Sequence, residues 1–228
     1  MTINEMFKSA GLTIGEEQER QFQTLFEFMT EYNKNVNLTS ITEFEDVVLK
    51  HFIDSTLPFS MLGITGNETF IDVGTGAGFP ALPLLIYYPN LTGTLCDSLA
   101  KRCTYLELAC EKIGVKAEII HARSEELGRA CREQYDIATA RAVAAMPVLT
   151  EFCLPFVKVG GSFIALKSVN EDISAADNAI KTLGGKLEKT MDYKLPNGDS
   201  RRLAIVRKIS QTPTKYPRSF ANITKKPL

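Results

Sequence analysis

Three glycines at alternate positions stand where the sequence changes from an apolar strand to a helix. Residues 69–73 form a short apolar run interrupted by Asp72, and Gly74, Gly76 and Gly78 follow it directly. Glycines let a loop backbone approach a ligand closely, and in a strand–loop–helix unit that ligand is typically a nucleotide. A tight turn without a ligand is the alternative that the glycines alone leave open.

The residue after the third glycine distinguishes two kinds of nucleotide. A dinucleotide-binding loop has the pattern G-x-G-x-x-G, and Phe79 stands at its sixth position here. The ring would crowd a pyrophosphate at the start of the helix. We therefore expect an adenosine cofactor without a pyrophosphate, with NAD as the second choice.

Polar residues end the next three predicted strands, at the edge of the sheet where such folds bind ligands. Asp97 can accept hydrogen bonds from a ribose diol, and Ser124 and Glu125 can meet an adenine edge. An acidic helix start with Ser124 as N-cap is an equal alternative for that pair. Arg141 can contact the cofactor or an RNA phosphate, and an ion pair with Glu125 or Asp97 is equally plausible.

Metal and thiol chemistry are not expected. The chain has two histidines, His51 and His121, and five cysteines without a C-x-x-C pair, so the sequence predicts neither a zinc site nor a disulfide framework. Cys103 and Cys110 lie seven positions apart, which places two small buried thiols on one face of a helix.

Four polar residues outside the strand ends have two interpretations. They either face an RNA or serve as buried polar packing, and we favour packing. They are Asn37, His51, Asp54 and Lys167.

The spacing of apolar residues divides the chain into a helical start and a strand–helix body. Apolar residues between positions 16 and 36 recur every three or four residues, which predicts an amphipathic helix, and residues 43–61 predict one or two more. This N-terminal helical segment, residues 1–66, should pack on the body. The predicted strands of the body are 69–73, 91–96, 115–120, 135–140 and 161–167, and its helices are 80–88, 100–113, 123–132, 146–157 and 171–183.

Strand–helix alternation at this pace predicts an α/β fold with a parallel sheet covered on both faces. Two last strands, 186–194 and 201–208, flank a Pro-Asn-Gly-Asp turn and should form an antiparallel hairpin. The body then extends over residues 67–210 and leaves a C-terminal tail, 211–228, with all three parts forming one structural unit.

The charge of the chain is uneven. The net charge is −1, but eight basic and no acidic residues follow position 200, so residues 1–200 carry −9. We expect the tail to supply RNA affinity through basic residues and to lie apart from the cofactor site, although a solvated end is the alternative. The tail's basic residues are Lys215, Arg218, Lys225 and Lys226.

No part of the sequence predicts a membrane span. The longest uncharged stretch, between residues 73 and 96, is interrupted by glycines and prolines too often for a membrane helix. The first residues lack the basic start and apolar run of a signal peptide. We therefore expect a cytoplasmic protein.

Short motifs spread over the chain resemble the bacterial RsmG family, also called GidB. Because they occur in the right order from Asn37 to Leu228, the resemblance is more specific than any single motif. They are Asn37-Leu38-Thr39-Ser40-Ile41, His51-Phe52-Ile53-Asp54-Ser55, Asp72-Val73-Gly74-Thr75-Gly76-Ala77-Gly78-Phe79-Pro80, Lys101-Arg102, Arg123-Ser124-Glu125-Glu126, Arg141-Ala142-Val143-Ala144, Tyr216-Pro217-Arg218 and Lys225-Lys226-Pro227-Leu228.

The resemblance implies a class I, seven-stranded, Rossmann-like methyltransferase that uses S-adenosyl-L-methionine. Its substrate would be N7 of one guanine in the decoding-region loop of 16S ribosomal RNA, with naked RNA and the assembled small subunit both open as the form recognised. Because N7 has a free lone pair, an in-line displacement requires no general base, and no catalytic residue is assigned. We expect a monomer.

The resemblance also implies which residues hold the cofactor. Ser124 stands where the family has a small apolar residue, which a backbone contact tolerates, and residues 219–222 replace a Lys-Pro-Gly-Thr type segment. The implied cofactor residues are Gly74, Gly76, Gly78, Phe79, Asp97, Ser124, Glu125 and Arg141.

Overall fold

A seven-stranded sheet forms the centre of the molecule in the computed structural model, which describes residues 1–141 and 143–228. Ala142, part of one motif above, lies outside the described residues. The strand order is β3-β2-β1-β4-β5-β7-β6. The strands are β1 (Thr69–Val73), β2 (Thr92–Asp97), β3 (Ala117–His121), β4 (Tyr135–Arg141), β5 (Val157–Lys167), β6 (Gly185–Lys194) and β7 (Ser200–Lys208).

The first five strands are parallel, and β7 is antiparallel to both β5 and β6. The predicted α/β fold, parallel sheet and terminal hairpin are therefore confirmed. All predicted strands exist, within two residues of the expected bounds except at the start of β5.

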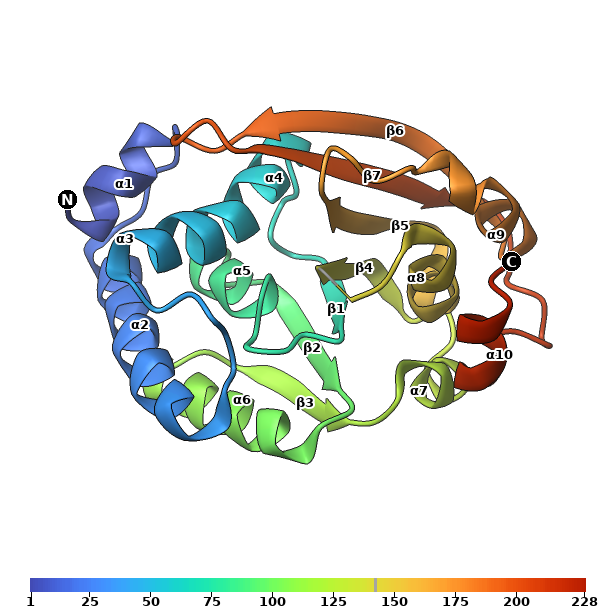
Figure 1. Ribbon diagram of the computed structural model, residues 1–228, viewed down its shortest axis with the longest axis horizontal. Helices are drawn as coiled ribbons and strands as arrows, with labels where there is room; N and C mark the ends of the chain where they lie inside the picture. Colours follow the sequence, from blue (N-terminus) through green and yellow to red (C-terminus); the bar gives the residue numbers. More distant parts are fainter. Residues whose placement is uncertain (142) are drawn as a thin grey trace.

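Helices cover both faces of the sheet (Figure 1), and the side chains of β1 show why. Phe70 joins one apolar cluster, with Phe52 and Leu82, whereas Ile71 joins the other, with Phe156. Successive residues of a strand point to opposite faces of the sheet, so a strand with apolar side chains on both faces needs helices on both sides. The helices are α1 (Ile3–Ser9), α2 (Glu16–Val36), α3 (Phe44–Val47), α4 (Asp54–Leu62), α5 (Ala81–Tyr87), α6 (Ala100–Ile113), α7 (Ser124–Ala130), α8 (Met146–Cys153), α9 (Asp177–Thr182) and α10 (Phe220–Lys225).

The N-terminal helical segment packs on one face of the sheet. Helix α2 lies against α5 and α6, and the Phe22 ring packs between Phe7 of α1 and Phe52. A π-helical turn, Val48–Ile53, joins α3 to α4. Such wider turns are often found at functional sites, and this one carries Lys50 and His51.

Two predicted helices are shorter than expected. The helix predicted to reach residue 157 ends at Cys153, because Pro155 has no backbone N–H and the chain passes through a short 3₁₀ turn into β5. The helix predicted from residue 171 begins only at Asp177, after a 3₁₀ turn. The Asp172 carboxylate accepts hydrogen bonds from the backbone and hydroxyl of Ser174, which favours a turn there.

The C-terminal tail is docked on the body. Tyr216 and Ile223 are buried in the apolar cluster that contains Phe156, and α10 packs on α8. The tail is therefore part of the folded body, because its apolar side chains complete this core.

Most of the basic side chains near the C-terminus form ion pairs. Five of the eight pair with carboxylates, so the net +8 overstates the unpaired positive charge of this region. The other three, here called the tail lysines, are exposed and form no ion pair with a described residue; they are Lys215, Lys225 and Lys226. The paired residues are Arg201, Arg202, Arg207, Lys208 and Arg218.

No helix among the described residues is long and apolar enough to cross a membrane. The cysteines of α6 are buried on one helical face, as predicted, and all five thiols of the chain are unpaired.

Candidate active site

A buried carboxylate holds the glycine loop in place. Asp72 Oδ2 accepts hydrogen bonds from the Thr75 hydroxyl at 2.7 Å and from the Ala81 backbone N–H at 3.2 Å. Its second oxygen has no partner among the described residues, and burial raises the pKa of this carboxyl to about 7. Asp72 therefore joins the end of β1 to the start of α5 and fixes the loop between them.

The three glycines of the loop have different roles. Gly74, Gly76 and Gly78 all have positive φ, a conformation that glycine adopts without strain. A Cβ on Gly76 would have its nearest neighbour, the Gly74 carbonyl oxygen, at 4.0 Å, whereas a Cβ on Gly78 would lie 2.4 Å from Cδ1 of Leu82. Gly78, one of the expected cofactor residues, thus faces the packing between α5 and α6 and lines neither of the cavities described below.

Asp97 connects the end of β2 to the glycine loop. It is 3% exposed, and its carboxylate accepts hydrogen bonds from the backbone N–H groups of Gly76 and Leu99, both at 2.9 Å. Arg102 lies 3.4 Å from the same carboxylate. An ionised carboxylate has about four acceptor positions, and with the Arg102 hydrogen bond counted one remains for a ribose hydroxyl.

Two adjoining cavities meet at Asp97. One, of about 430 Å³, lies over the glycine loop and is lined by Gly74, Gly76, Phe79 and Arg141; we call it the loop cavity. The other, of about 110 Å³, lies at the start of α7; we call it the α7 cavity. Both are also lined by Gly74, Ser98 and Val143. The seven expected cofactor residues other than Gly78 line one or both cavities.

The α7 cavity is formed by the loop after β3 and the first turn of α7. The N-cap residue of α7 is Arg123, without a side-chain cap, and not Ser124, so the capping alternative for Ser124 is wrong. Glu125 is 4% exposed and makes no hydrogen bond or ion pair with the residues that the structure describes. A buried carboxylate facing a cavity without a partner is available to a donor on a ligand.

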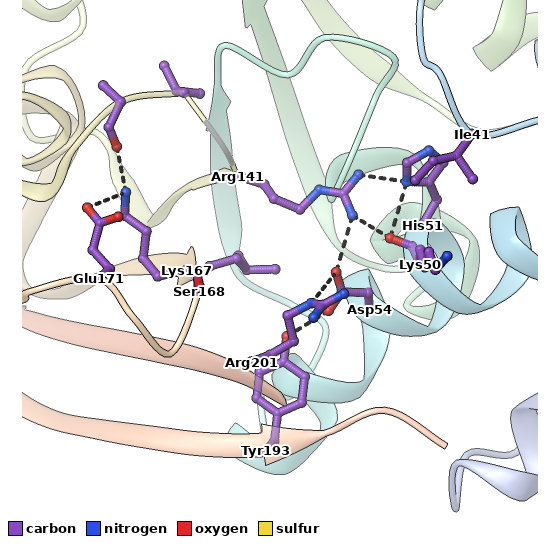
Figure 2. A pocket seen from close by; sticks show the side chains of 13 residues that line it. Ile41, Lys50, His51, Asp54, Arg141, Lys167, Ser168, Glu171, Tyr193 and Arg201 are labelled. Carbon is purple, nitrogen blue, oxygen red and sulfur yellow. Dashed lines mark hydrogen bonds and ion pairs between the residues drawn. The ribbon is translucent and has the colours of Figure 1, made fainter. Parts of the chain in front are cut away.

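Arg141 lies where β4 ends, but its partners differ from those expected. Its guanidinium donates to the Lys50 carbonyl at 2.9 Å and lies 3.6 Å from the Asp54 carboxylate (Figure 2). The expected ion pair with Glu125 or Asp97 is therefore wrong. The guanidinium also lies over the ring of Phe79, 5.2 Å from its centroid. Arg141 thus ties β4 to the π-helical turn and to α4.

His51 is held as a neutral ring beside Arg141. Its Nδ1 lies 3.1 Å from a guanidinium nitrogen of Arg141 and its Nε2 lies 3.0 Å from the Thr39 hydroxyl. Nδ1 also lies 3.2 Å from the Lys50 carbonyl. Because the guanidinium can only donate, the shorter Arg141 contact requires Nδ1 as acceptor, with the proton on Nε2. Burial and the positive charge of Arg141 lower the pKa of His51 to about 3. The ring stacks on Phe79 at 4.4 Å, so the pair forms one wall of the loop cavity.

A third cavity, of about 610 Å³, opens on the other side of Arg141 and His51; we call it the basic cavity. It shares Arg141, His51 and Val143 with the loop cavity, so these side chains lie between the two. Four basic and two acidic side chains line it (Figure 2): Lys50, Arg141, Lys167, Arg201, Asp54 and Glu171.

The polar groups of the basic cavity are fixed by one another. The Tyr193 hydroxyl donates to Asp54 at 3.0 Å and Arg201 Nε lies 3.4 Å from the same carboxylate. On the opposite side, Lys167 Nζ contacts the Ala144 carbonyl at 2.5 Å and the Glu171 carboxylate at 3.0 Å (Figure 2).

The expectation of buried polar packing is met by three of the four polar residues named from the sequence. His51, Asp54 and Lys167 are buried, and they also line the basic cavity, whereas Asn37 is exposed. Tyr193 and Arg201 were not identified as site residues, because no pattern in the chain links the hairpin to Asp54, 139 positions before Tyr193.

In the described part of the chain, no group of three His, Cys, Asp or Glu side chains is placed to hold a metal ion.

Comparison with solved structures supports the fold. A putative methyltransferase from Bacillus halodurans C-125 superposes with a TM-score of 0.55 at 15% identity, covering 69% of this chain and 99% of that one. The strand order, with an antiparallel hairpin at one edge of an otherwise parallel sheet, and the glycine loop at the carboxyl end of β1 define a Rossmann-like methyltransferase fold.

Comparison with sequences identifies the family. The family described as GidB, rRNA small subunit methyltransferase G, matches residues 18–202. The chain is 46% identical over 226 residues to the ribosomal RNA small subunit methyltransferase G of Leuconostoc citreum (strain KM20), which covers 96% of this chain and 95% of that protein. For the protein of that name from Streptococcus pyogenes serotype M3 the identity is 45% over 225 residues, covering 96% and 94%. The chain belongs to the RsmG (GidB) family, and the resemblance found in its motifs is confirmed.

Proposed function

We propose that this chain transfers a methyl group from S-adenosyl-L-methionine to N7 of a guanine in the decoding-region loop of 16S ribosomal RNA. The observation that carries the proposal is a pair of cavities that share Arg141, His51 and Val143 as lining residues: one lies over a glycine loop, and the other is lined by four basic side chains. A methyl donor and a polyanionic acceptor require such neighbouring sites. Family membership supports this assignment and favours S-adenosylmethionine over NAD.

The donor site fits an adenosine with a short polar extension. The glycine loop gives room beside Gly76, and Asp97 keeps one acceptor position for a ribose hydroxyl. The α7 cavity adds a buried carboxylate, Glu125, beyond Asp97. Bound S-adenosylmethionine would supply an activated methyl group on a positively charged sulfur.

The acceptor site fits a nucleotide that has left its stack. A guanine must be unstacked before its N7 can reach a buried donor. The basic cavity offers Lys50, Lys167 and Arg201 to phosphate or base oxygens, and Asp54 keeps Arg201 and Arg141 in position. These contacts orient the base, and orientation lowers the barrier of a displacement reaction.

The protonation state of the site agrees with a reaction that needs no base. Guanine N7 has a free lone pair, so no proton is removed when the methyl group arrives. His51, at the boundary of the two cavities, is neutral and already uses both ring nitrogens, with Arg141 and Thr39. We therefore assign it the positioning of Arg141 and of the Phe79 wall. We propose that the enzyme acts as a monomer in the cytoplasm.

The test separates donor binding from acceptor binding. Arg201→Gln should lower methyl transfer to 16S ribosomal RNA or small subunits at least tenfold, because an RNA contact is lost, while S-adenosylhomocysteine affinity measured by calorimetry stays within twofold. Lys158→Gln is the matched control, since Lys158 pairs with Asp136 near the opposite end of β4 and β5. Equal activity of Arg201→Gln and wild type would show that the basic cavity does not bind the acceptor. Binding of NAD without binding of S-adenosylhomocysteine would refute the donor assignment.

A further inference from the structure

The C-terminal segment, residues 212–228, is held against the two helices that flank the α7 cavity. From α7, Arg129 donates to the Pro217 carbonyl at 3.2 Å. Arg132, just after that helix, donates to the carbonyls of Tyr216 and Thr212. The position of this segment is thus set by the same helix whose first turn carries Ser124 and Glu125.

Helix α8 fixes the segment at a second place, through two consecutive residues. The Glu151 carboxylate is fully buried and accepts hydrogen bonds from the backbone N–H and the guanidinium of Arg218, at 2.7–3.1 Å. The next residue, Phe152, stacks on Phe220, with ring centroids 6.0 Å apart and an angle of 5° between the planes. The anchor at Arg218 therefore determines where the Phe220 ring lies.

Phe220 closes the outer side of the α7 cavity. Phe152 and Phe220 both line it, together with Asp97 and Glu125. The Arg123 guanidinium lies over the Phe220 ring, 5.0 Å from its centroid. The volume of the cavity, about 110 Å³, is several times the roughly 10–15 Å³ that one water molecule requires. Two aromatic rings and the carboxylate of Glu125, which has no partner among the described residues, thus line the cavity, a combination that suits a planar heterocycle bearing an amino group.

We propose that the C-terminal segment is part of the cofactor site, with Phe220 forming the wall that packs on the purine ring of an adenosine cofactor. The nature of the cofactor rests on the proposed function. The position of the cavity, beyond the ribose-binding carboxylate of Asp97, places the purine end there. The family match ends at residue 202, so this role belongs to a part of the chain outside it.

Phe220 is 45% exposed, so the test has to distinguish a role in cofactor binding from a role in RNA binding. An exposed aromatic ring near basic residues can also stack on a base of single-stranded RNA. Phe220 lines the α7 cavity and stacks on Phe152. Both observations favour contact with the cofactor, because a ring that stacks on an RNA base requires neither.

The first experiment measures binding of S-adenosylhomocysteine and of adenosine by calorimetry. Aromatic stacking on a base corresponds to roughly five- to hundredfold in affinity, so Phe220→Ala should weaken both ligands about tenfold, and Phe220→Tyr should retain most of the affinity. Lys225→Ala, on the same helix, should leave both affinities unchanged. Melting temperatures of all variants show whether each is folded.

The second experiment uses the absence of tryptophan from the chain. Phe220→Trp introduces the only tryptophan of the chain at the cavity, and its emission should change on saturation with S-adenosylhomocysteine. Val159→Trp, exposed near the start of β5, should report no change.

Three results would overturn the inference. Unaltered ligand affinity in a folded Phe220→Ala protein refutes the wall. Unaltered ligand affinity together with weaker RNA binding assigns Phe220 to RNA instead. If the wild-type protein binds no S-adenosylhomocysteine, the proposed function fails as well. This failure can be distinguished from failure of the Phe220 inference alone, because it does not depend on the residue at position 220.

Discussion

Replacing Arg218 by alanine should destabilise the whole molecule, although residue 218 lies beyond the last strand. Its partner Glu151 has no exposed surface, and the guanidinium supplies three of the four hydrogen bonds between the two residues. Removing one member of a buried ion pair typically costs about 3–5 kcal/mol, because the other charge is left without a partner.

We expect the lower end, about 3 kcal/mol, in this case. The Arg218 backbone N–H still donates to Glu151 at 2.8 Å in the variant, and the arginine side chain is 22% exposed, so water can reach the carboxylate. For a chain of this size, 1 kcal/mol corresponds to roughly 2–4 °C. The melting temperature of Arg218→Ala should therefore fall by about 6–12 °C.

The assay is thermal unfolding followed by circular dichroism, with two further variants. Lys225→Ala, an exposed residue of the same segment, is the matched control and should change the melting temperature by about 1 °C or less. The double variant Arg218→Ala/Glu151→Leu should be more stable than Arg218→Ala alone, because the unpaired buried charge is gone. If Arg218→Ala melts within about 1 °C of wild type, the segment is not held by this pair.

Three other predictions follow from charge and burial. In a His121→Gln protein, His51 is the only histidine, and its imidazole resonance can be followed by NMR. This resonance should not titrate between about pH 5 and 8, because the pKa of His51 is lowered to about 3. A transition near the ordinary pKa of histidine would contradict the buried neutral ring. The pKa of Asp72 is raised from 3.8 to about 7, so the native state retains a proton that the unfolded chain releases. The contribution of Asp72 to the free energy of unfolding therefore declines as the pH rises from about 4 to 7. Asp72→Asn should flatten that decline in urea unfolding, and an unaltered decline would refute the assignment. Replacing the tail lysines by glutamine should reduce the slope of log RNA affinity against log salt by about 2, and an unchanged slope would show that they do not meet phosphates.

The sequence predicted those parts of the structure that depend on local pattern. The glycine loop, Asp97 and the first turn of α7 lie at the ends of consecutive parallel strands, so the position of each along the chain is enough to place them at one edge of the sheet. Strand and helix periodicity placed the elements themselves, and the errors at α8 and α9 come from local turn chemistry at Pro155 and Asp172.

The partners of Arg141 could not be predicted in the same way. They come from α4 and the π-helical turn, which tertiary packing brings to β4, and from the hairpin, which reaches Asp54 through Tyr193 and Arg201. No local spacing encodes such contacts.

The docking of the tail had a signal in its sequence. Three large apolar side chains, Tyr216, Phe220 and Ile223, lie among its basic residues, and Tyr216 and Ile223 are buried. The basic residues predicted a phosphate contact for Arg218, which instead binds Glu151.

The central claim is methyl transfer to guanine N7 in small-subunit ribosomal RNA, and one measurement tests it directly. Ribosomal RNA from cells lacking this protein is incubated with the purified chain and S-adenosylmethionine, as naked RNA and as assembled subunits, and N7-methylguanine is mapped along the 16S molecule. We predict one new N7-methylguanine in the decoding-region loop, absent when the cofactor is omitted. A map unchanged in both substrates, or a methyl group on another atom or base, would contradict the proposed function.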